Sequence, residues 1–124
     1  EDIRRIIRER PQKLNLNEFY LVAQEYEPGT DEFTEVFETA VRMFPDDTIA
    51  NLNAANIAMG KKDMKNAERY LSKAGDTPEA VYARGIYAAL SGDYDTAGRL
   101  FEQARQEGLS EAAEALHQIK ELKK

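Results

Sequence analysis

Few residues in this sequence have types and spacings suited to chemistry. The single histidine, His117, has no cysteine or second histidine to join it, so neither a zinc site nor a histidine base is predicted. Acidic pairs occur at Asp46-Asp47 and at Asp93 and Asp95, but each stands at a predicted helix start, where the helix dipole accounts for it. The chain has no glycine-rich phosphate loop and no Gly-x-Ser-x-Gly or His-Glu-x-x-His motif. We therefore expect no enzyme, no metal and no cofactor.

Charge and hydropathy narrow the classes of partner. The formal net charge is −6, so the basic surface that nucleic-acid-binding proteins present to phosphates is not expected. Residues 15–47 hold nine acidic side chains against Arg42 alone, whereas residues 48–75 hold five basic ones against Asp63 and Glu68. We interpret both stretches as solvated helix faces. No apolar run approaches the roughly 20 residues of a membrane-spanning helix, so membrane insertion is not expected. Because the chain begins with Glu1, we expect a piece of a longer protein.

Helical spacing of apolar residues runs through almost the whole chain, and no segment alternates as a strand does. Asn15 with Glu18 forms a predicted capping box, Pro45 ends one helix, and Gly75 and Gly108 follow two others. The other predicted helix caps are Thr30, Asp47 or Thr48, Asp63, Thr77, Asp93 and Ser110. We expect an all-α fold. Its predicted parts are an N-terminal helix in 1–14, three helix pairs in about 15–45, 46–75 and 76–109, and a C-terminal capping helix in 110–124.

The second helices of the three pairs share one spacing, four positions and then three. The three sets are Phe33, Phe37 and Ala40; Ala67, Leu71 and Ala74; and Ala97, Phe101 and Ala104. The first helices share a small central residue, which is Ala23, Ala55 or Gly85. Small residues that recur in this way let neighbouring helices cross closely, and the large residue fills the groove beside the crossing.

This pattern resembles the tetratricopeptide repeat (TPR), a helix–turn–helix unit of about 34 residues. The third pair carries the fullest match, with Gly85, Gly92-Asp93-Tyr94, Ala97, Phe101 and Ala104. The resemblance implies an α–α superhelix, or solenoid, of three TPR-like pairs with a further helix at each end. Two residues depart from the family. Phe33 replaces a small alanine, so the first pair should splay or shift, and Arg84 replaces an apolar residue, so its head group should reach water or an acid.

The resemblance also implies a function, because in TPR proteins the first helix of each pair lines a concave groove that holds a peptide. Carried onto this sequence, the groove residues are Tyr20, Gln24, Leu52, Asn53, Asn56, Met59, Tyr82, Ile86 and Ala89. Amide side chains suit hydrogen bonds to a peptide backbone, and tyrosines and aliphatic residues suit its side chains. We expect a non-catalytic scaffold or adaptor that binds a protein or peptide. The plainer interpretation is that the asparagines simply lie at the surface of one helix.

The N-terminal segment leaves two alternatives open. Ile3, Ile6 and Ile7 fall on one helical face, so this helix is either a second cap or the last helix of a preceding domain. A structural spacer or self-association module would expose this isoleucine patch and dock another domain of its own protein there. A peptide-binding groove would instead leave Tyr20 and Tyr82 exposed.

A narrower resemblance concerns the segment from Arg10 to Ala58, which begins RPQKLNLNEFYLVAQEY. It is similar to the C-terminal repeat region of large cell-envelope proteins of anaerobic Gram-negative bacteria, where the repeats follow an outer-membrane-protein-A-like domain. The resemblance implies a periplasmic or outer-membrane-associated protein, whose upstream domain is one candidate partner. Composition and spacing carry no information on the compartment.

Overall fold

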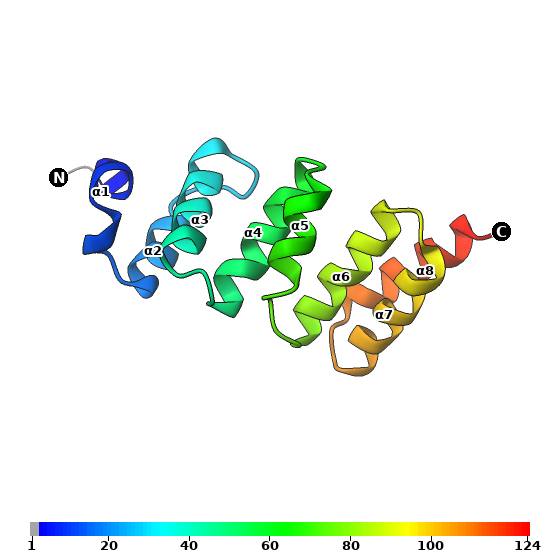
Figure 1. Cartoon of the computed structure of the whole chain (residues 1–124). Helices are drawn as coiled ribbons and strands as arrows, with labels where there is room; N and C mark the ends of the chain where they lie inside the picture. Colours follow the sequence, from blue (N-terminus) through cyan, green and yellow to red (C-terminus); the bar gives the residue numbers. More distant parts are fainter. Residues whose placement is uncertain (1–2) are drawn as a thin grey trace.

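The computed structural model describes residues 3–124 of the chain, and side chains from residue 5 onward. Over this range every regular element is helical and no strand forms, so the all-α prediction is confirmed. The elements are α1 (Ile3–Glu9), a 3-10 turn η1 (Pro11–Lys13), α2 (Leu16–Ala23), α3 (Asp31–Met43), α4 (Thr48–Gly60), α5 (Met64–Leu71), α6 (Pro78–Leu90), α7 (Tyr94–Gln106) and α8 (Glu111–Leu122). They follow one another along an elongated body, with α1 and α8 at opposite ends (Figure 1).

Most helices begin where their capping residues predict. The Asn15 side chain accepts a hydrogen bond from the backbone N–H of Glu18, whose own side chain bonds back to Asn15, which completes the capping box of α2. Side-chain oxygens also cap the helices from α3 to α7, contributed by Thr30, Asp47, Asp63, Thr77 and Asp93. Ser110 is the exception. It precedes α8 in a helical conformation and makes no side-chain capping bond, so that predicted cap is wrong.

Two helices end earlier than their apolar spacing predicts. Helix α2 stops at Ala23, so Tyr26 lies in the following turn, and α5 stops at Leu71, so Ala74 lies beyond it. Both residues nevertheless face the interior: Tyr26 packs on the first core cluster and Ala74 is buried. A buried residue in a turn is apolar, just as a buried residue in a helix is. Apolar spacing alone therefore predicts helices that are too long.

The second and third pairs repeat one backbone geometry. Helix α6 has the bounds of α4 shifted by 30 residues (Thr48–Gly60 and Pro78–Leu90), and the starts of α5 and α7 differ by the same shift. In the turn between the helices, Lys62 has φ 60° and Gly92 has φ 84°. Gly60 is the last residue of α4. The left-handed position that ends the helix therefore falls on a lysine in one pair and on a glycine in the other.

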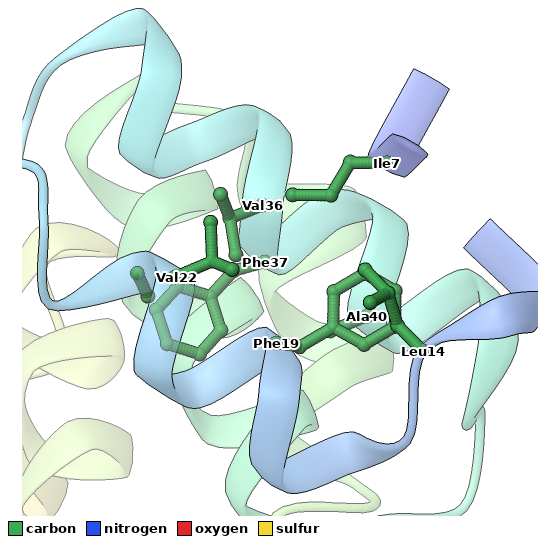
Figure 2. Close-up of a cluster of buried hydrophobic side chains, with 8 residues drawn as sticks. Ile7, Leu14, Phe19, Val22, Val36, Phe37 and Ala40 are labelled. Carbon is green, nitrogen blue, oxygen red and sulfur yellow. The ribbon is translucent and has the colours of Figure 1, made fainter. Parts of the chain in front are cut away.

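Each pair and its neighbours enclose a separate cluster of buried side chains. Figure 2 shows the first cluster, where Ile7 of α1 reaches Val36 of α3 above the ring of Phe19 from α2. Ile7 is buried and Ile6 is half-buried, while Arg8 Nε lies 2.7 Å from Oε1 of Glu35. The helix α1 is thus packed onto the first pair. Ile3, the third member of the predicted isoleucine face, lies outside the described side chains.

The first pair packs less closely than the two that follow. Helices α2 and α3 touch over a smaller region than α4 with α5 or α6 with α7. One reason is the short length of α2, and another is Phe33, whose ring lies against that of Phe37 with centroids 4.9 Å apart. A large residue at this position fills the space in which the corresponding alanines, Ala67 and Ala97, are completely buried.

The charged head group of Arg84, which lies on a packed helix, has two polar partners. Its Nη2 donates a hydrogen bond of 2.7 Å to the carbonyl oxygen of Leu71, the last residue of α5. Its Nη1 lies 3.5 Å from a carboxylate oxygen of the fully exposed Asp76. The prediction that the head group would pair is confirmed, and the guanidinium adds a second hydrogen bond to a carbonyl that also accepts the backbone N–H of Ala74, at 3.2 Å.

Candidate functional site

Eight of the nine predicted groove residues lie on α2, α4 and α6, the first helices of the three pairs, and Gln24 directly follows α2 as its C-cap. Gln24 and Asn56 are exposed, whereas Met59 is buried in the core cluster of the second pair. The remaining six are half-buried: Tyr20, Leu52, Asn53, Tyr82, Ile86 and Ala89. Met59 therefore offers little surface to a ligand, and the accessible part of this face is made by the other eight.

The α6 portion of the face is close to the last helix. Tyr82, Ile86 and Ala89 pack on a cluster of buried residues that includes Phe101 of α7 and Ile119 of α8. Tyr82 has its ring centroid 5.4 Å from that of Phe101. The face at this end is therefore continuous with the core under α8, a relationship that no local sequence pattern could indicate.

Tyr20 has a partner within the protein. Its hydroxyl donates a hydrogen bond of 2.6 Å to Oδ2 of Asp47, the same oxygen that accepts the backbone N–H of Ala50 at the start of α4. Burial, together with this hydrogen bond to a carboxylate, raises the pKa of the Tyr20 phenol well above its usual range. Tyr20 thus ties the first pair to the second, and only its ring is left for contact with a ligand.

A cavity of about 560 Å³ opens between the start of α3 and α4. Two predicted residues, Asn53 and Asn56, line it together with the apolar side chains of Phe33 and Ile57, which the sequence-based set omitted. The rest of its lining is Pro28, Gly29, Asp31, Thr34, Gly60 and Lys61. Asn53 donates to the carbonyl of Ile49 one turn back, and no described residue donates a hydrogen bond to its side-chain oxygen. The cavity combines apolar walls with two amides.

Two large aliphatic side chains on α4 and α6 are exposed. Ile49 of α4 is 54% exposed and Leu90 of α6 is 52% exposed. Half-buried Leu52 and Ile86 lie on the same two helices, which contact each other directly. Neither Ile49 nor Leu90 belongs to the predicted set, although both lie one turn or less from members of it.

A wider hollow of about 1000 Å³ lies between α7 and α8. Long charged side chains dominate it, and several pair with one another, as Arg105 does with Glu102 and Lys123 with Asp95. Hydrogen bonds from Arg105 lower the pKa of Glu102 to about 2. We place no site there, because its lining groups already satisfy each other at the surface.

Among the described residues there is neither a cluster of metal-binding side chains nor a membrane-spanning helix. His117 is exposed on α8, and within residues 3–124 no three histidine, aspartate or glutamate side chains gather closely enough to hold a metal ion. No helix in this range combines the length and apolar character that crossing a lipid bilayer requires.

Comparison with known proteins adds no relative. No protein-family model matches the chain, and no curated protein or solved structure gives a match either.

Proposed function

We propose that this chain is a TPR-like helical-repeat module that binds a protein or peptide segment and catalyses no reaction. The observation that carries the proposal is the cavity beside α4, where the side chains of Phe33 and Ile57 meet the amides of Asn53 and Asn56. The repeated geometry of α4–α5 and α6–α7 supports the TPR-like assignment.

The chemistry of this cavity suits a short peptide with one apolar side chain. Phe33 and Ile57 supply an apolar wall for that side chain, and a volume of about 560 Å³ accommodates it. Asn56 can both donate to and accept from a peptide backbone, and Asn53 keeps an oxygen available. The exposed Ile49 then extends the apolar contact along α4.

The remaining predicted residues do not line this cavity. Tyr20 lies on α2, Gln24 directly follows α2, and Leu52 lies beside Asn53 on α4. Tyr82, Ile86 and Ala89 on α6 border the core under α8, so we assign them to the edge of the binding face rather than to its centre.

A selection from a random peptide library displayed on phage, followed by titration of the enriched peptides, tests the proposal. We expect Asn56→Ala to weaken binding about tenfold, because it removes hydrogen bonds made only with the peptide. Lys65→Ala, an exposed change on α5, serves as the matched control and should leave binding unchanged. Enriched peptides that ignore Asn56→Ala, or a library from which no peptide is enriched, would refute the proposed site.

A second candidate function is that of a structural spacer or self-association module within a larger cell-envelope protein. Exposed leucines favour it, since Leu21 of α2 is 63% exposed and Leu122 of α8 is 60% exposed. The isoleucine patch does not, because Ile7 is buried against the first pair. Sedimentation equilibrium of the wild-type chain and of Leu21→Lys distinguishes the two functions: a spacer that self-associates through this surface should dissociate on substitution, whereas a peptide-binding monomer should not change.

A further inference from the structure

A second cavity, of about 420 Å³, lies on the side of the molecule formed by α3, α5 and the start of α4. Its lining is Glu38, Val41, Arg42, Pro45, Asn51, Arg69, Tyr70 and Lys73. None of the nine predicted groove residues is among them. The site is therefore separate from the binding face proposed above and does not depend on it.

The charge of this cavity is opposite to that of the whole chain. The net charge of the protein is −6, yet three cations line the cavity against one acid, Glu38. Glu38 is partly neutralised by Lys61, whose Nζ lies 3.3 Å from its carboxylate. Neither Arg42 nor Arg69 forms an ion pair with a described residue. The cavity thus keeps unpaired positive charge within an acidic protein.

The three cations are held differently. The guanidinium of Arg69 lies over the ring of Tyr70, 4.9 Å from its centroid, which restricts its position without neutralising it. Lys73 lies 3.3 Å from Asp46, whose side chain is 91% exposed, so this pair is open to competition from a ligand. Arg42 is exposed at the edge of the cavity.

The floor of the cavity contains a buried amide. Asn51 is only 1% exposed, and its Nδ2 donates to the carbonyl oxygens of Pro45, at 2.9 Å, and Asp47, at 2.8 Å. No described residue donates a hydrogen bond to its Oδ1. Asn51 is nevertheless one of the residues that line this cavity, so its amide lies at the cavity wall.

We propose that this cavity binds a carboxylate of an acidic peptide segment, with Arg42, Arg69 and Lys73 on the anion and Asn51 Oδ1 on an adjacent N–H. A peptide supplies both groups, since each acidic side chain stands beside backbone amides. An inorganic anion such as phosphate has no apolar part, so it leaves Val41, Pro45 and Tyr70 without an apolar partner. Arginine is suited to this role because its guanidinium binds a carboxylate through two parallel hydrogen bonds.

The test is a titration followed by backbone and side-chain amide NMR signals of the whole chain. The probes are an acetylated, amidated tetraglutamate, the matched tetraglutamine, and inorganic phosphate. We expect saturable shifts for the Asn51 side-chain amide and the Arg42 and Arg69 signals with tetraglutamate, and none with tetraglutamine. Binding should weaken at higher salt, as expected for a charged contact near the surface.

Variants separate this site from general attraction between charges. Arg42→Gln should weaken tetraglutamate binding about tenfold, as loss of a charged hydrogen bond predicts. Lys65→Gln removes one positive charge from α5 outside the cavity and should leave the affinity unchanged. Equal weakening by both variants, shifts that avoid Asn51, or tighter binding of phosphate than of tetraglutamate would each overturn the proposal. Because Arg42 is exposed and forms no ion pair with a described residue, its substitution should not unfold the chain.

Discussion

A Cβ atom added to Gly85 of α6 would lie 2.6 Å from Cε1 of Phe101 in α7, closer than two carbon atoms can approach. The third pair therefore combines the smallest residue with a large aromatic ring at its crossing. The second pair places Ala55 and Leu71 at the corresponding positions, and both are buried in one cluster. The combined volume of the two side chains is therefore similar in the two pairs, although the individual side chains differ in size. Close packing at the crossing requires this.

This contact predicts that a larger side chain at position 85 must be offset by a smaller one at position 101. Gly85→Ala should destabilise the chain, because displacing the buried ring costs about 1–3 kcal/mol and exceeds the roughly 1 kcal/mol gained in helix propensity. Adding Phe101→Leu should restore part of the lost stability by copying the second pair. Urea unfolding of both single variants and the double variant measures the coupling. Additive effects of the two substitutions would contradict the proposed contact.

Replacing Lys62 by glycine should stabilise the fold. It has φ 60°, a conformation that costs a residue with a side chain about 1 kcal/mol, and Gly92 occupies the equivalent turn at no such cost. Lys62→Gly should therefore raise the free energy of unfolding by about 1 kcal/mol. Lys62→Ala keeps the Cβ atom while removing the charge, so it should give no comparable gain. A gain of similar size with alanine would assign the effect to charge instead of to backbone strain.

The two partners of Arg84 should contribute differently to the stability of the fold. Arg84→Met keeps the apolar stem but removes the 2.7 Å hydrogen bond to the Leu71 carbonyl, which keeps only the longer bond from Ala74, and this should cost about 1 kcal/mol. Asp76→Asn removes only the exposed acid, 3.5 Å from the guanidinium, and should change stability very little. Thermal unfolding of the two variants compares them. If Asp76→Asn were as damaging as Arg84→Met, the ion pair and not the helix-end hydrogen bond would be the stabilising contact.

The aspartate caps predict the acid dependence of stability. Hydrogen bonds from Asn66 lower the pKa of Asp63, and hydrogen bonds from Thr96 lower the pKa of Asp93, both from an ordinary value of 3.8. A lowered folded-state pKa gives stability that is present above the unfolded-state value and is lost as the pH falls through the folded-state value. Stability should therefore decline below about pH 4.

The matched variant for this effect is the double substitution Asp63→Asn and Asp93→Asn. Asparagine still caps a helix but does not titrate in this range, so the variant should lose less stability than the wild type between pH 5 and pH 3. Urea midpoints at a series of pH values measure the difference. Parallel pH curves for the two proteins would show that other carboxylates control the acid unfolding.

Local signals explain how much of the fold could be predicted. The capping box at Asn15 and Glu18 and the caps at Asp63 and Asp93 need only neighbouring residues, so the sequence located these helix starts. The early ends at Ala23 and Leu71 were missed, because they depend on burial of the turns that follow. The predicted binding face was incomplete for the same reason, because it also depends on packing between segments distant in the sequence. Asn53 and Asn56 do line a cavity, but Phe33 and Ile57 join them only through the packing of α3 on α4.

By itself, the sequence determined the all-helical fold and the spacing of small and large residues along the helices, since these follow from spacing along one chain. Tertiary structure alone decided which side chains remain accessible. It buried Met59, joined Tyr20 to Asp47, and placed Tyr82 beside the core under α8. It also brought Arg42 and Arg69 to one cavity from different helices. Exposure and charge clustering depend on contacts between distant segments, and a periodic pattern carries no information about them.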